Sequence, residues 1–95
     1  MSPFDVHVIE LNPKNDEHVR ASTDSLIAML TEQGMDVLHD DREATAGQKF
    51  ADSDLIGIPM RVVVSEKTVA AKKFEVKDRK TGEVKYQAVA EIIGR

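Results

Sequence analysis

The sequence contains no cysteine among its 95 residues. This absence excludes disulfide bonds, thiolate metal sites and a cysteine nucleophile together. The chain also has no apolar run close to the ~18 residues that a membrane-spanning helix needs, and its N-terminus lacks the basic and then apolar segments of a signal peptide. We therefore expect a cytoplasmic protein with no membrane partner.

Basic residues are in the minority, since 13 Lys and Arg stand against 17 Asp and Glu and give a formal net charge of −4. A protein that coats nucleic acid non-specifically relies on clustered Lys and Arg, so the composition argues against that class. It leaves open a protein that reads a few exposed bases.

Signatures of catalysis are missing too. The five glycines form neither a dinucleotide-binding motif nor a P-loop, and no serine lies in a nucleophile elbow. His39, Asp40, Asp41 and Glu43 carry groups that could bind Mg²⁺. Neighbouring residues of an extended stretch point to alternate faces, however, so these side chains should not converge. We expect no catalytic residue, no metal site and no cofactor.

The hydrophobic patterns that are present indicate a globular domain. Residues 4–11 alternate apolar and polar side chains, which predicts a strand. A helix with an apolar stripe should follow from Asp16 to about Gly34, and a short strand should cover 35–39. This order predicts two parallel strands joined by a helix.

The middle of the chain predicts a second helix and a buried strand. Thr45 and Gln48 have the spacing of a capping box, so the helix should begin near Ala46, and Gly57 should end it. Residues 60–64 are almost all apolar, which is typical of a central strand that helices cover on both faces.

The last third alternates apolar and polar residues over 73–87, around a turn at 80–82. This pattern predicts an antiparallel hairpin with one solvent-facing side, and a short helix follows it. The element order is therefore βαβαβββα. We expect one domain over residues 1–95, an α/β fold of three layers in which helices flank a five-stranded mixed sheet.

One group of residues has the chemistry to bind an unstacked base. Phe50 and Asp54 are four residues apart and share a helix face. Arg61 points away from Met60 on the buried strand, and Lys67 follows that strand. The ring could stack, the carboxylate could accept from guanine, and the cations could donate to the base or to phosphate. The alternative is structural: Phe50 belongs to the core and Arg61 pairs with Asp54.

A resemblance to a known family covers essentially the whole chain and is strongest over residues 36–67, DVLHDDREATAGQKFADSDLIGIPMRVVVSEK. This segment resembles the C-terminal anticodon-binding domain of bacterial-type prolyl-tRNA synthetases, which are class II aminoacyl-tRNA synthetases. The flanks agree, since SPFDVHVIELNP resembles the opening strand of that domain and FEVKDRKTGE resembles its hairpin. The resemblance implies a five-stranded mixed sheet with helices on both sides.

The resemblance also implies which residues read the anticodon. Phe50 matches the aromatic residue beside the anticodon bases, and Asp54 matches a carboxylate, often Glu in relatives, that contacts a guanine. Arg61 and Lys67 match cationic contacts to base or backbone. We further expect residues at the rim of this site, namely Arg42, Glu43 and Lys49.

The function that the resemblance implies is recognition of the proline tRNA anticodon by a non-catalytic domain. The parent would be an ATP-dependent proline–tRNA ligase of a dimeric family. Its catalytic domain, which would bind ATP and Mg²⁺, is not in the sequence, so we expect an excised domain. Two alternatives stay open: a protein-interaction or dimerisation module of the same fold, and a small-molecule binder at the C-terminal ends of the parallel strands.

Overall fold

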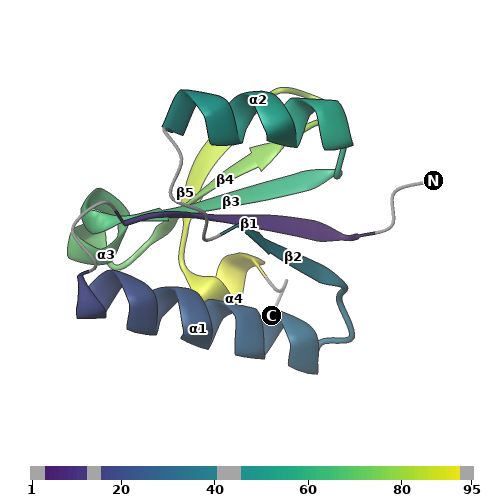
Figure 1. The fold of residues 1–95 in the computed structure, drawn as a ribbon. Helices are drawn as coiled ribbons and strands as arrows, with labels where there is room; N and C mark the ends of the chain where they lie inside the picture. The colour runs from purple at the N-terminus through teal and green to yellow at the C-terminus, as the bar shows by residue number, and fades with distance from the viewer. Residues whose placement is uncertain (1–3, 13–15, 41–45, 93–95) are drawn as a thin grey trace.

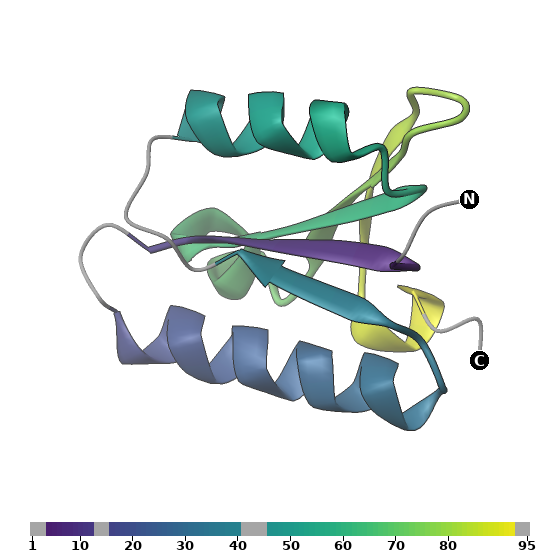
Figure 2. The same ribbon diagram turned by 45° about the vertical axis from the view of Figure 1, so that its right-hand side comes forward.

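A mixed five-stranded sheet forms the middle layer of the molecule, for which the computed structural model describes residues 4–12, 16–40 and 46–92. The strands are β1 (Val6–Leu11), β2 (Val37–Asp40), β3 (Met60–Ser65), β4 (Phe74–Asp78) and β5 (Val84–Gln87). The helices are α1 (Glu17–Glu32), α2 (Ala46–Ile56), α3 (Glu66–Ala71) and α4 (Val89–Ile92). Figures 1 and 2 show α1 and α4 on one side of the sheet and α2 on the other. The predicted α/β fold is confirmed.

The strand order is β2-β1-β3-β4-β5. β1 pairs in parallel with both β2 and β3, whereas β4 pairs antiparallel with β3 and with β5. The predicted parallel pair joined by a helix and the predicted C-terminal hairpin are both present. Because β1 lies between β2 and β3, the chain passes over one side of the sheet with α1 and over the other side with α2.

The main core lies between the sheet and α1. Its buried residues are apolar, and they are Val6, Val8, Val19, Leu26, Leu30, Val62, Val64, Val76 and Ile92. Three of them form the predicted stripe along α1, and the others come from β1, β3, β4 and α4. Each side chain of this size stabilises the fold by about 1.5–3 kcal/mol when it is fully buried.

The residues between these valines point to the other side of the sheet, because side chains alternate along a strand. On β1 this row contains His7 and Ile9, and on β3 it contains Arg61 and Val63. His7, Ile9 and Val63 are buried, and α2 contacts β1. β3 is thus a central strand covered on both faces, as its composition predicts, and Arg61 is placed toward α2.

The ends of the two long helices follow from local hydrogen bonding and backbone geometry. The carboxylate of Asp16 accepts a hydrogen bond from the amide of His18 at 2.8 Å and caps α1. Gly34 and Gly57 follow α1 and α2 with φ of +81° and +75°, values that favour glycine. None of the helices in the described ranges has the length and apolar character of a membrane span.

Helix α3 is an element that the sequence pattern does not predict. The helix has only six residues, and Val69 is the one large apolar side chain of the helix that packs against the core. The sequence of α3 therefore shows no apolar stripe. The helix begins directly after β3 because Thr68 closes its first turn. The Thr68 hydroxyl accepts from the amide of Ser65 at 2.8 Å and donates to the Ser65 carbonyl at 2.9 Å.

Candidate functional site

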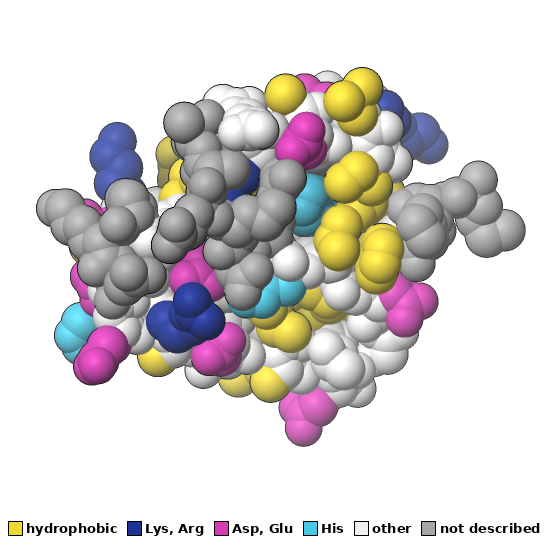
Figure 3. All heavy atoms as spheres, in the orientation of Figure 1, with side chains coloured by type: hydrophobic (Ala, Val, Ile, Leu, Met, Phe, Trp, Pro, Cys, Tyr) yellow, Lys and Arg dark blue, Asp and Glu magenta, His cyan; other side chains and the backbone are white. Residues whose placement is uncertain are grey.

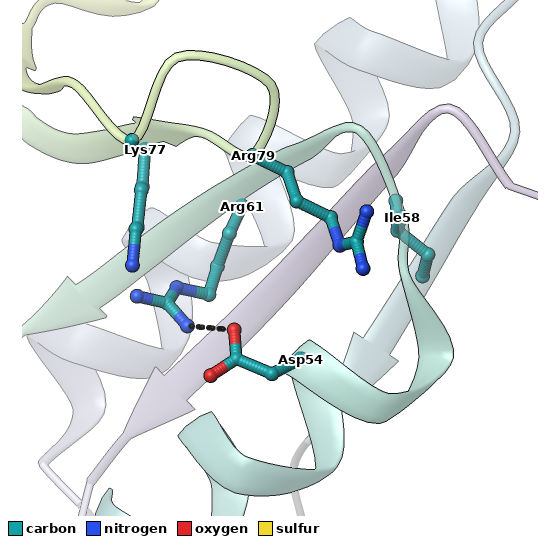
Figure 4. Close-up of a pocket in the computed structure, with 6 residues that line it drawn as sticks. Asp54, Ile58, Arg61, Lys77 and Arg79 are labelled. Carbon is teal, nitrogen blue, oxygen red and sulfur yellow. Dashed lines mark ion pairs between the residues drawn. The ribbon is translucent and has the colours of Figure 1, made fainter.

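A pocket of about 330 Å³ opens between the C-terminal half of α2 and the β3–β4 part of the sheet. Its lining residues are mostly charged, and they are Asp54, Ile58, Arg61, Lys77, Arg79 and Gly82. Figure 4 shows Arg61 and Lys77 extending from the sheet, with Asp54 facing them from α2 and Arg79 approaching from the turn after β4. The pocket therefore joins parts of the chain that are far apart in sequence.

Arg61 is the central residue of the pocket. Its guanidinium carbon lies 4.6 Å from the centroid of the Phe50 ring, a cation–π contact. Its Nη1 lies 3.7 Å from Oδ1 of Asp54, and the Arg61 side chain is only 13% exposed. The structure thus brings together three of the four predicted readers. Phe50 is half-buried beside Arg61 and is not part of the main core cluster.

Lys77 lies directly opposite Arg61 in the antiparallel β3–β4 pair. Like charges that face each other across a strand pair destabilise a sheet. Asp54 is the one carboxylate among the described residues that line the pocket, and its side chain is 69% exposed. A solvated carboxylate offsets only a small part of such repulsion. This arrangement favours an occupant that is anionic or rich in hydrogen-bond acceptors.

Arg79 adds a third cation at the C-terminal end of α2. Its backbone amide donates to the carbonyl of Pro59 at 2.9 Å, which ties the turn after β4 to the segment that leads into β3. Its guanidinium lies 3.5 Å from the position that a Cβ would take at Gly57. The negative end of the α2 dipole favours a cation here.

The hydrogen-bonding capacity of Arg61 is only partly used. Among the described residues, its buried Nε has no hydrogen-bond partner. The distance of 3.7 Å to Asp54 is also longer than the ~2.7–2.9 Å of a charge-assisted hydrogen bond. Arg61 Nη1 and the Asp54 carboxylate are therefore not engaged in a short hydrogen bond with each other and can pair with a ligand.

Lys67 lies away from the other three predicted readers. It is exposed in the first turn of α3, whereas Arg61 is near the start of β3. Ser65, at the end of the strand, is four residue steps beyond Arg61, which corresponds to about 13 Å along the strand. In addition, α3 contacts α1, on the side of the sheet opposite to α2. Lys67 therefore does not line the same pocket.

Lys49, expected at the rim, is a residue of α2 whose side chain is buried between the helix and β1. It is 3% exposed, and its ammonium donates to the backbone carbonyl of Glu10 at 2.7 Å. A buried ammonium requires a close acceptor, and the acceptor here belongs to β1. The hydrogen bond therefore fixes α2 against β1. The other two expected rim residues, Arg42 and Glu43, lie outside the described residues.

The residues considered for a metal site lie elsewhere or have other partners. Asp41 and Glu43 are outside the described residues. His39 Nε2 lies 3.1 Å from Oε1 of Glu10, a buried carboxylate whose Oε2 is 3.4 Å from Nε of Arg20. Within the described ranges, no group of three or more potential ligands could hold a metal ion.

Lys77 and Arg79 are members of the site that the sequence pattern did not identify. Both occur in the segment FEVKDR, whose alternation predicts only that Lys77 faces solvent. Its position opposite Arg61 depends on the register between β3 and β4. The sequence pattern contains no local signal for that register.

Comparison with known proteins identifies the class. The family model described as "Anticodon binding domain" matches residues 5–95, so the chain belongs to this family of anticodon-binding domains. Its relatives include the proline–tRNA ligase of Pediococcus pentosaceus, 51% identical over 92 residues, and that of Citrifermentans bemidjiense, 44% identical over 95 residues. The alignments cover 97% and 100% of this chain and 16% of each relative. The resemblance to prolyl-tRNA synthetases is confirmed.

The fold has a close counterpart among solved structures. The crystal structure of the prolyl-tRNA synthetase from Cryptosporidium parvum, in complex with halofuginone and AMPPNP, superposes with a TM-score of 0.88. The match covers 97% of this chain and 20% of that chain, at 22% sequence identity. At this level of identity the similarity establishes the fold. The chain spans about a sixth of the length of the proline–tRNA ligases that it matches.

Proposed function

We propose that this chain recognises the anticodon of proline tRNA, as the anticodon-binding domain of a proline–tRNA ligase. The observation that carries the proposal is the pocket in which Arg61 lies over Phe50 and next to Asp54, with Lys77 and Arg79 around it. In a chain with a net charge of −4, three cations around one exposed carboxylate are an unusual concentration. Family membership supplies the substrate class.

The chemistry of the pocket suits guanine, and proline anticodons carry two adjacent guanines. The Asp54 carboxylate can accept from guanine N1–H and N2–H₂, while Arg61 can donate to O6 and N7. The weak contact between these two side chains leaves both groups available. Lys77 and Arg79 are then assigned to O6 or to the phosphates of the same nucleotides.

Lys67 has a different role in this proposal. Because it lies beyond the far end of β3, it contacts the RNA backbone away from the base held in the pocket. Arg42 and Glu43 stay predicted rim residues. The proline–tRNA ligase activity, its ATP and Mg²⁺ requirements, its dimeric assembly and its cytoplasmic location belong to the proposed parent enzyme.

The test is an NMR titration of the chain with two anticodon stem-loops, one with both guanines and one with adenines in their place. We expect shift changes at Phe50, Asp54 and Arg61 with the guanine loop and weaker binding of the adenine loop. Asp54→Asn should remove the preference for guanine, since the amide replaces an acceptor by a donor. Asp24→Asn, an exposed position on α1, is the control. No shift with either loop at millimolar RNA would overturn the proposal.

One observation favours the alternative of a protein-interaction module. Leu55 and Ile56 at the end of α2 are 85% and 44% exposed, and Figure 3 shows apolar side chains gathered over the C-terminal end of α2 and the adjoining strand ends. Such a patch suits contact with another protein surface. Sedimentation of the chain with and without Leu55→Ser tests self-association through this patch. If the chain sediments as a monomer at all concentrations, the hypothesis of a dimerisation module is excluded.

A further inference from the structure

The outer half of the sheet leaves a face uncovered on the α2 side. Residues directly opposite each other in a strand pair share a face. Glu75 of β4 lies opposite Val63 of β3 on one side and opposite Tyr86 of β5 on the other. In the same way, Lys77 of β4 lies between Arg61 of β3 and Val84 of β5. The face that carries Arg61 therefore continues across the hairpin. Val84 is 48% exposed there and Tyr86 is 59% exposed.

Tyr86 is the aromatic side chain of this surface. Its hydroxyl donates to Oε1 of Glu75 at 3.2 Å, which anchors the hydroxyl end of the ring across the strand pair. This hydrogen bond, together with the negative charge of Glu75, raises the pKa of Tyr86 above its ordinary value of 10.0. At neutral pH the phenol is therefore protonated and its ring is held on the open sheet.

We propose that Tyr86, with Val84 and Lys77, forms a second nucleotide platform, on which the base next to the one in the Arg61 pocket stacks. This proposal rests on the function inferred above. The ligand that occupies the pocket and the platform together is single-stranded RNA of two or more nucleotides. An aromatic ring on an open sheet face is a sequence-tolerant surface for an unstacked base. The pocket would then read one base while the platform holds its neighbour.

The separation of the two sites fits consecutive nucleotides. β5 is two strands away from β3, or about 10 Å, and Tyr86 is two residues along β5 from Val84, or about 7 Å. The Cα atoms of Arg61 and Tyr86 are thus about 12 Å apart by these spacings. Sheets of four strands stack two or three bases in other RNA-binding modules, which is the same scale.

The charge around the platform favours RNA over a protein partner. Lys77 is the cation of the platform itself, and the pocket beside it adds Arg61 and Arg79. Glu75 is the one carboxylate in the register rows described above, and it already accepts the Tyr86 hydroxyl. An exposed ring at the edge of a cationic pocket matches a base followed by its phosphate.

The composition of the chain makes the platform directly observable. Tyr86 is the only tyrosine, and there is no tryptophan. A Tyr86→Trp variant therefore carries a single indole, which can be excited outside the absorption band of RNA. We expect the guanine stem-loop to quench this fluorescence, and binding should stay within about twofold of wild type because indole also stacks.

Affinity measurements then separate the ring from its hydroxyl. Tyr86→Ala should weaken binding about 5- to 100-fold, as expected for the loss of one base–aromatic stack. Tyr86→Phe keeps the ring and should bind within about threefold of wild type. Leu55→Ala removes an exposed apolar side chain outside this face and should leave binding unchanged. Thermal unfolding of each variant checks that the fold is kept.

The outcomes distinguish this inference from the function on which it rests. If wild type prefers the guanine loop but Tyr86→Ala binds equally well, the platform is wrong and anticodon recognition stands. If Tyr86→Phe loses as much affinity as Tyr86→Ala, the hydroxyl and not the stacked ring is responsible, which also overturns the platform. If wild type binds neither loop, the proposed function fails and the platform fails with it.

Discussion

At the scale of single residues, Arg61 occupies a position that a purely structural residue would fill poorly. It lies opposite Lys77, its Nε lacks a partner among the described residues, and its carboxylate neighbour Asp54 is mostly solvated. A buried charge with such partners contributes little to the stability of a fold. The residue is better explained by a ligand than by packing.

This reasoning predicts the stability of an Arg61→Met variant. Met keeps most of the volume over Phe50 and removes the repulsion from Lys77, so the free energy of unfolding should change by less than about 1 kcal/mol. RNA affinity should fall at least tenfold. Urea unfolding and RNA titration measure the two effects.

The control is Val63→Ala, which comes from the same row of β3 and is 4% exposed. It should cost about 1–3 kcal/mol, since it empties a packed position. If Arg61→Met cost more than Val63→Ala, the structural ion-pair reading of Arg61 and Asp54 would be correct.

A second residue-scale prediction concerns the titration of Tyr86. Because Glu75 raises its pKa, the phenol should ionise above pH 10.0 in the folded chain. Glu75→Ala removes the acceptor and the charge, so the titration midpoint should move down toward 10.0. Tyrosinate absorbance follows this one residue, as the chain has no other tyrosine. Equal midpoints in the two proteins would refute the contact.

The contact between Tyr86 and Glu75 also makes the stability of the fold depend on pH. Its contribution is fully present below pH 10.0 and is lost as the pH rises through the raised pKa of Tyr86.

At the scale of elements, hydrophobic periodicity was sufficient for the five strands, the long helices and the short C-terminal helix. The spacing of Phe50 and Asp54 and the alternation around Arg61 were also sufficient to place three of the predicted readers together. The sequence pattern missed α3, because Thr68 and one partly buried side chain, Val69, establish it without an apolar stripe. As Lys67 belongs to α3, its separation from the site was missed too.

The contributions of Lys77 and Arg79 could not be predicted for a different reason. Alternation tells which face a residue takes but not which residue lies opposite it. That register depends on the packing of the hairpin against β3 and on the hydrogen bond between Arg79 and Pro59. Long-range pairing of this kind has no local signal in the sequence.

The end of α2 gives a prediction at this scale. Gly57 has φ of +75°, so Gly57→Ala should destabilise the chain by about 1 kcal/mol through backbone strain. A Cβ there meets the Arg79 guanidinium only at 3.5 Å, an ordinary contact, so no larger steric cost is expected. Thermal unfolding measures the change.

The matched control is Gly47→Ala, near the start of the same helix. Among the described residues, apart from the chain neighbours of Gly47 and the backbone of its own helix, no atom lies within 4 Å of a Cβ at this position. Alanine favours helix over glycine, so this variant should be more stable by about 0.5 kcal/mol. Opposite signs for the two substitutions support the assigned end of α2. Stabilisation by both would contradict it.

At the scale of the whole molecule, the surface charge is unevenly distributed. The chain carries −4 overall, yet the pocket gathers Arg61, Lys77 and Arg79 on one side of the sheet. An acidic molecule with a local cationic site repels most of an RNA and attracts it only in one orientation. We therefore expect the chain to bind RNA with modest affinity, and we expect that affinity to fall when the cations of the pocket are replaced.

Salt dependence tests this distribution. If Lys67, Lys77 and Arg79 each neutralise one phosphate, the slope of log affinity against log salt should be about −2.1. Arg79→Gln should reduce its magnitude by about 0.7. Lys85→Gln makes the same charge change on the opposite face, since Lys85 lies opposite the core residue Val76. Equal effects of both variants would indicate non-specific attraction.

The alternation along β3 has a consequence for how such a domain can change. Val62 and Val64 serve the core with α1, whereas Arg61 and its partners on α2 and β4 serve the pocket. One strand therefore separates the requirements of folding from those of recognition, residue by residue. Under the proposed function, substitutions at the pocket would alter which bases are accepted while the main core stays as it is, which would make this side of the sheet a scaffold for new specificities.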